Sequence, residues 1–113
     1  MSPATDAMNM DQPSRHVAVD EVFSVILATQ AAPRGGAAAL YFAGNGFGQD
    51  GDLARAGLCG QASMATLRLE KAIREEDHGQ QRSALGMIGG LRDQWDRMKP
   101  VDTACDIASK AAA

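Results

Sequence analysis

Large side chains are scarce in this chain. Aromatic residues make up only 4% of its 113 residues, with one Trp, one Tyr and three Phe, and much of the 45% hydrophobic content is alanine. A chain of this length has room for one domain. Because small apolar side chains bury little area, we expect a single copy to be marginally stable and to gain stability by pairing as a two-fold dimer.

An excess of positive charge is also missing. Lys and Arg number 11 against 14 Asp and Glu, which gives a formal net charge of −3 and a pI of about 5.2. This balance argues against a broad nucleic-acid footprint and against attraction to anionic lipid. A small regulator that touches nucleic acid through Arg82, Arg92 and Arg97 is kept as an alternative.

Long apolar runs are absent as well, so the sequence predicts neither a secretory signal nor a membrane span. We expect a disordered tail over 1–16, a single helical domain over 17–100 and an alanine-rich tail or short helix over 101–113. The cytoplasm is the expected location, where both cysteines would stay reduced. Secretion without a cleaved signal is an alternative that composition leaves open.

What the chain does contain is a helical hairpin pattern. In the second arm, predicted over about 80–99, apolar residues follow one another at steps of four, three, four and three, which places them on one helical stripe. Pro100 should end this helix, because proline disfavours helical geometry at the residue before it. The first arm, predicted over about 52–77, repeats the rhythm with smaller residues such as Ala62 and Ala65, which leave room for a bulky neighbour.

The two stripes together form what we call the hairpin seam. The sequence predicts an all-α fold in which two hairpins pair through this seam as a dimeric four-helix bundle. The seam consists of Leu58, Ala62, Ala65, Leu69, Ile73, Ala84, Ile88, Leu91, Trp95 and Met98.

One or two shorter helices are expected before the hairpin. Residues 19–27 suit a helix face with Asp20 as a possible N-cap, although the β-branched content of 22–27 also suits a buried strand. Helix is favoured because no confident strand partner is found elsewhere. After a break at Pro33, residues 37–43 predict a short helix.

The glycine-rich segment 44–52 invites a functional hypothesis, because Gly46, Gly48 and Gly51 satisfy the dinucleotide pattern G-x-G-x-x-G. Asp50 and Asp52 would repel phosphates, and the rest of the chain lacks the strands of a parallel sheet. A calcium loop is rejected because the twelfth position from Asn45 is an alanine. We expect a flexible connection in which one of the two aspartates caps the next helix, with ligand binding by this loop as an alternative.

A metal site was weighed at Glu75 and His78, whose Glu-x-x-His spacing occurs in di-iron bundles. The facing helix has no inward glutamate, so His78 is interpreted instead as a residue at a helix C-terminus. Cys59 is expected to be a buried packing residue, and neither it nor Cys105 belongs to a C-x-x-C pair. A Cys–His pair with His16 or His78 is not favoured, and no metal or cofactor is expected.

These patterns favour a small acidic helical protein-interaction module, such as an adaptor, a chaperone-like subunit or an antagonist. It is expected to have no catalytic activity, to form a homodimer and to bind another protein of unknown identity. Nucleic-acid contact and ligand binding by the glycine-rich loop are the alternatives.

Overall fold

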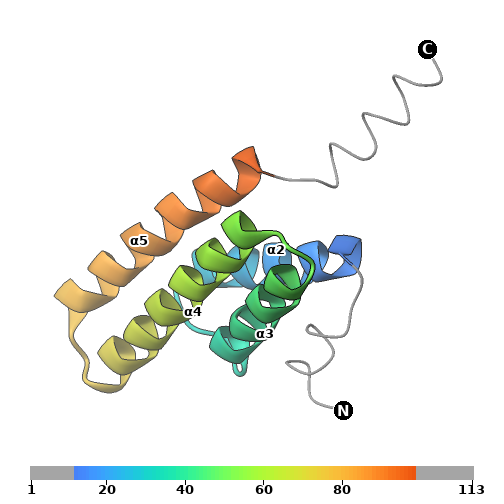
Figure 1. Cartoon of the computed structure of the whole chain (residues 1–113). Helices are drawn as coiled ribbons and strands as arrows, with labels where there is room; N and C mark the ends of the chain where they lie inside the picture. Colours follow the sequence, from blue (N-terminus) through green and yellow to red (C-terminus); the bar gives the residue numbers. More distant parts are fainter. Residues whose placement is uncertain (1–11, 99–113) are drawn as a thin grey trace.

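The computed structural model describes residues 12–98 and is all-helical over this range, with four helices and no strand (Figure 1). The helices are α2 (Gln12–Thr29), α3 (Gly36–Gln49), α4 (Leu53–Arg74) and α5 (His78–Arg97). The all-α prediction is confirmed, and the helical alternative for 19–27 is the one the structure shows. In the described part, no helix combines the length and the apolar character needed to cross a membrane.

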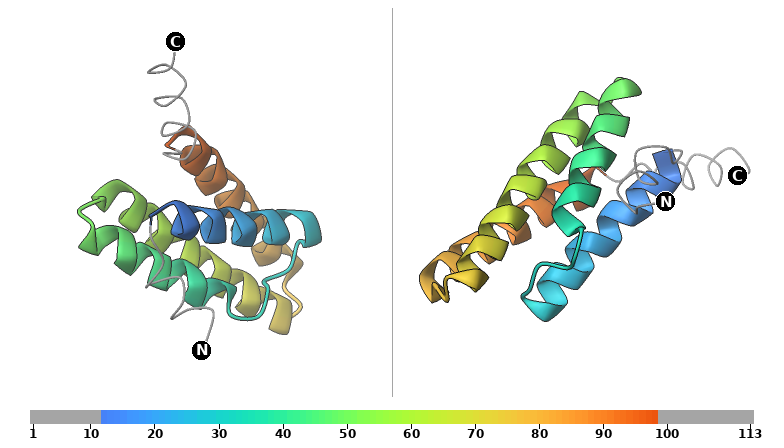
Figure 2. Two further views of the ribbon diagram at one scale, coloured as in Figure 1. Left: turned by 90° about the vertical axis from the view of Figure 1, so that its right-hand side faces the viewer. Right: turned by 90° about the horizontal axis from the view of Figure 1, so that it is seen from below.

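The four helices form a closed ring of contacts within one chain. α4 packs between α3 and α5, and α2 packs against α3 and α5, so that each helix has two main neighbours. Figures 1 and 2 show α2 on the side of the molecule opposite α4, lying across the bundle at a slant. The bundle that was expected from two hairpins of two copies is therefore completed by α2 and α3 of the same chain. The dimer itself stays a prediction.

The hairpin arms are confirmed, with helix ends set by two aspartates. Asp52 Oδ1 accepts a hydrogen bond from the backbone N–H of Arg55 at 3.2 Å, and Asp77 Oδ1 accepts one from Gln80 N–H at 3.0 Å. Each side chain thereby satisfies a donor that the first helical turn leaves without an intrahelical partner. The expected cap at the start of α4 is thus confirmed.

The prediction for His78 is wrong. This residue begins α5 instead of ending α4, because α4 stops at Arg74 and the left-handed Glu76, with a φ of 54°, reverses the chain. Asp77, at which the first arm was predicted to end, is the cap of the second arm.

The glycine-rich segment is the largest departure from expectation. Most of it, 44–49, is the last part of α3 and not a flexible connection. A Cβ on Gly44 would lie 3.1 Å from Cys59 Cβ and 3.2 Å from the backbone oxygen of Ala56, and one on Gly46 would collide with the Arg15 guanidinium. Packing against α4 and α2 offsets the low helix propensity of these glycines, which local sequence reasoning took as evidence for a loop.

The predicted tail is too long by at least five residues, because α2 begins at Gln12. Arg15 and His16 are buried in the bundle, and Asp20 lies inside α2 and does not cap it. The predictions for residues 1–11, Pro100 and 101–113 lie outside the described residues.

The core is centred on Trp95, which has no exposed surface. Its ring stacks on His16 at 4.2 Å between centroids, and Phe47 meets it in a T-shaped arrangement at 5.7 Å. Phe23 is tilted against it at 6.4 Å. Three of the five aromatic side chains of the sequence therefore meet where α2, α3 and α5 come together, while Tyr41 and Phe42 contact each other elsewhere on α3.

Candidate functional site

The structure places the hairpin seam inside the single chain. Eight of its ten residues are buried, while Met98 is partly buried against the core and Ile73 is 38% exposed. The buried members are Leu58, Ala62, Ala65, Leu69, Ala84, Ile88, Leu91 and Trp95. A second copy could contact them only if the bundle opened, so a candidate interaction surface has to be sought elsewhere.

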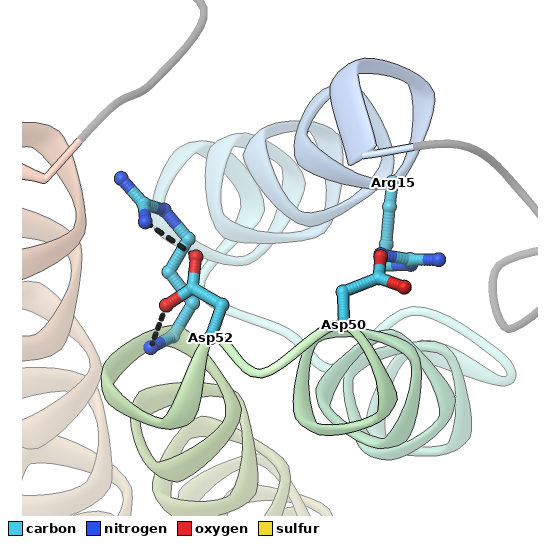
Figure 3. A network of polar contacts seen from close by, with 4 residues as sticks. Arg15, Asp50 and Asp52 are labelled. Carbon is cyan, nitrogen blue, oxygen red and sulfur yellow. Dashed lines mark hydrogen bonds and ion pairs between the residues drawn. The ribbon is translucent and has the colours of Figure 1, made fainter.

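Charged groups gather at the end of the bundle where α3 leads into α4 (Figure 3). Arg15 on α2 donates to Asp50 Oδ2 at 2.8 Å, and its guanidinium carbon lies 5.1 Å from the centre of the Phe47 ring. Asp52 and Arg55 form a second ion pair within the first turn of α4. Both aspartates of the suspected ligand loop are thus engaged by arginines: Asp50 ties the end of α3 to α2, and Asp52 caps the start of α4.

The other candidate reactive residues do not come together. Cys59 is fully buried, and burial raises the pKa of its thiol to about 12, with the nearby Asp52 charge acting in the same direction. The thiolate is the nucleophilic form, so this thiol is unsuited to nucleophilic chemistry. Glu75 and His78 are exposed on either side of the turn, and the described residues contain no cluster of three or more potential metal ligands.

The arginines weighed for nucleic-acid contact are on α5. Arg92 is occupied by Asp96, with Nε to Oδ1 at 3.0 Å, and by the Ser24 hydroxyl at 3.1 Å. Arg82 and Arg97 are exposed near opposite ends of the same helix. The structure therefore does not gather the three into one site.

A second apolar stripe runs along α4, on the side that faces away from the core. It follows the same steps of four, three, four and three as the hairpin seam. Its large members are among the most exposed hydrophobic side chains of the described part, and a Cβ added at either glycine would meet nothing within 4 Å. We call this set the outer stripe: Leu53, Gly57, Gly60, Met64 and Leu67.

Neighbouring helices widen the outer stripe into a face. Tyr41 on α3 is 54% exposed, and Met87 on α5 is 41% exposed. Between α3 and α4 lies an open groove of about 600 Å³, whose lining includes Ala38, Tyr41, Phe42, Gly60, Met64 and Leu67. A shallower groove on the α5 side is shared by Met64 and Met87. We use the term outer face for the outer stripe together with Tyr41 and Met87.

The outer face is bare of charge along most of its length. From Gly35 to Leu67 the sequence contains three charged residues, Asp50, Asp52 and Arg55, and all three belong to the ion pairs at the end of the bundle. Arg68 borders the face at its other end. The same spacing rule that reveals the hairpin seam also picks out this stripe, although two of its five positions are glycines and carry no apolar side chain.

The chain was compared with protein-family models, curated proteins and solved structures, and nothing matches it. Its function therefore has to be argued from its own residues and their arrangement.

Proposed function

We propose that this chain is a small helical protein-interaction module that holds its partner on the outer face. The proposal includes no catalytic step and no cofactor, and the cytoplasm stays the predicted location. It keeps the interaction role expected from the sequence and moves the contact from the buried hairpin seam to an accessible surface.

The observation that supports this proposal is the amount of apolar surface gathered on one side. The five large side chains of the outer face are between 41% and 75% exposed. At about 200 Å² for a fully exposed side chain of this size, they present on the order of 500 Å² to solvent. Scattered single hydrophobic residues are normal on a surface, whereas apolar side chains gathered into a patch of this extent often mark a functional surface.

The chemistry of the face indicates the kind of contact. It offers backbone at the two glycines and apolar side chains around them, with charge only at its borders, where Arg68 lies. An amphipathic helix with an uncharged face suits such a surface, since helices dock into apolar grooves through residues at three- and four-residue spacing. Small residues at the contact allow the two backbones to approach at the lower end of the usual 8–10 Å.

The test is site-specific photo-cross-linking of the full chain in the cell that makes it. A photoreactive residue replaces Met64 on the outer face or, as the control, Val17, which is a similarly exposed apolar residue on α2. We expect one defined protein to be cross-linked from position 64 and not from position 17. The same products from both positions, or none from either, would overturn the proposal.

A further inference from the structure

We infer that the partner of the outer face is a second copy of this chain, docked with the two α4 helices antiparallel and crossing at Gly60. This inference rests on the proposed function and names the partner for it. The resulting dimer is isologous, meaning that the same patch of each copy contacts the other.

The order of residues along the outer stripe is suited to an antiparallel contact with a second copy. A two-fold axis through Gly60 reverses the stripe of the partner, so that Leu53 meets the partner subunit's Leu67, and Met64 meets the partner subunit's Gly57. Met64 therefore faces an open glycine position, the leucines at the two ends of the stripe pack on each other, and at the centre the two bare backbones face each other. The stripe is complementary to its own reverse, which is the condition for a symmetric knobs-into-holes contact.

Size and charge agree with this arrangement. The outer stripe extends over about 21 Å of helix at 1.5 Å per residue. The large side chains of the outer face present on the order of 500 Å², and the glycine and alanine surface between them adds to this area, so the dimer would lie at the small end of the range of stable interfaces, roughly 1,200 Å² in total. No charged side chain lies between Arg55 and Arg68, so the centre of the contact would bury no ion, and Arg68 would lie at its rim.

The pairing also gives a reason for glycine at two helix positions that have open space around them. Each glycine costs a helix roughly 0.5 to 1 kcal/mol relative to alanine. Within one chain nothing crowds Gly57 or Gly60, unlike Gly44 and Gly46, whose space is taken by neighbouring atoms. A close contact with another backbone is what would require these two positions to stay small.

The first experiment is sedimentation velocity of the full chain from about 1 µM to about 500 µM. We expect wild type to shift from monomer to dimer over this range. Gly57→Gln with Gly60→Gln fills the open positions and should weaken dimerisation at least about 100-fold, while leaving the monomer folded because glutamine is the better helix former. Gly86→Gln on the outward side of α5, also in open space, is the matched control and should dimerise like wild type.

The second experiment tests the register by disulfide cross-linking in a Cys105→Ser background, where the remaining Cys59 is buried. Gly60→Cys lies on the proposed axis and should give a disulfide dimer on mild oxidation. Leu53→Cys mixed with Leu67→Cys should cross-link across the dimer, whereas Leu67→Cys alone should not. Efficient self-cross-linking of Leu67→Cys would indicate parallel helices and would overturn the arrangement.

The failure of this inference is distinguishable from that of the proposed function. A wild-type chain that stays monomeric at about 500 µM, or a dimer that survives the glutamine substitutions, overturns the second copy as the occupant of the outer face. In either case, photo-cross-linking of a different protein from position 64 still supports the proposed function. Self-cross-linking of the chain from position 64 supports both.

Discussion

The indole Nε1 of Trp95 donates a hydrogen bond to Oδ1 of Asp20 at 2.7 Å, and this bond joins α5 to α2. The two residues are 75 positions apart in the sequence. One lies in the hairpin and the other in the helix that closes the bundle over it, so the bond fixes how α2 sits on the hairpin. It also satisfies the only polar group of a side chain that is otherwise fully buried.

Replacing Asp20 with Ala is expected to lower the free energy of unfolding by about 1 to 3 kcal/mol, because the buried indole N–H loses its acceptor. Asp20→Asn keeps an oxygen at that position and should cost less. Urea denaturation followed by Trp95 fluorescence measures both losses. Equal losses for the two variants would show that the hydrogen bond does not fix the packing of α2.

Alanine substitutions at Gly44 in α3 and at Gly57 in α4 are expected to change the free energy of unfolding in opposite directions. In Gly44→Ala the new methyl group would press on Cys59 Cβ and the Ala56 backbone, which cannot rotate away, so the variant should lose about 1 to 3 kcal/mol. In Gly57→Ala the methyl group enters open space, and the helix should gain roughly 0.5 to 1 kcal/mol. Thermal denaturation, at a concentration where the chain is monomeric, compares the stabilities of the two variants with that of wild type. A stabilised Gly44→Ala variant would show that α3 and α4 are not in close contact at this point.

The hairpin could be predicted from sequence because its information is local. The steps of four and three around Ile88 and Trp95 define a buried stripe whatever covers it, and Asp52 and Asp77 stand just before the helices they cap. These signals depend on residues within a few turns of each other, so they can be recognised in the sequence without knowing the tertiary neighbours.

The remainder of the fold depends on contacts that no local pattern encodes. Arg15 and His16 look like part of a polar tail until Phe47 and Trp95 cover them. Gly44 favours a loop by propensity and is helical only because α4 approaches it. The seam was therefore assigned to a dimer, because only short helices over 19–27 and 37–43 were predicted where the structure has the longer α2 and α3 as the other half of the bundle.

The two residues of the ion pair between Arg15 and Asp50 should contribute unequally to the free energy of unfolding. The Arg15 side chain is only 6% exposed and lies over the Phe47 ring, whereas the Asp50 side chain is 48% exposed. Asp50→Ala is expected to cost about 1 to 3 kcal/mol, because the buried guanidinium loses this acceptor. Arg15→Ala should cost clearly more, because it also removes packing and the cation–π contact.

Urea denaturation of Asp50→Ala, Arg15→Ala and the double variant separates the two contributions. The coupling energy between the two substitutions reports the ion pair, and the remainder of the Arg15→Ala loss reports its packing. A loss that is the same for both single variants would contradict the proposed role of Arg15 as a packing residue between α2 and α3.

Cys59 is expected to be protected from alkylation by the fold. Burial raises the pKa of its thiol from 9.0 to about 12, so the native chain should contain almost no thiolate at pH 8. In the Cys105→Ser background, iodoacetamide should label Cys59 slowly in buffer and rapidly in denaturing urea. Mass spectrometry over time measures both rates. Fast labelling of a chain that retains its helical circular dichroism spectrum would contradict the burial of this thiol.

The same raised pKa sets the sign of a pH effect on stability. Below pH 9.0 the thiol is protonated in both the folded and the unfolded chain, so its contribution to folding is fully present. Between pH 9.0 and about 12 the unfolded chain releases the thiol proton first, and the free energy of unfolding should fall as the pH rises. Cys59→Ala in the Cys105→Ser background has no thiol at this position but keeps every other group that titrates in this pH range, so it is the control. Parallel curves of unfolding free energy against pH for the two proteins, measured by urea denaturation, would show that the thiol pKa is not raised by folding.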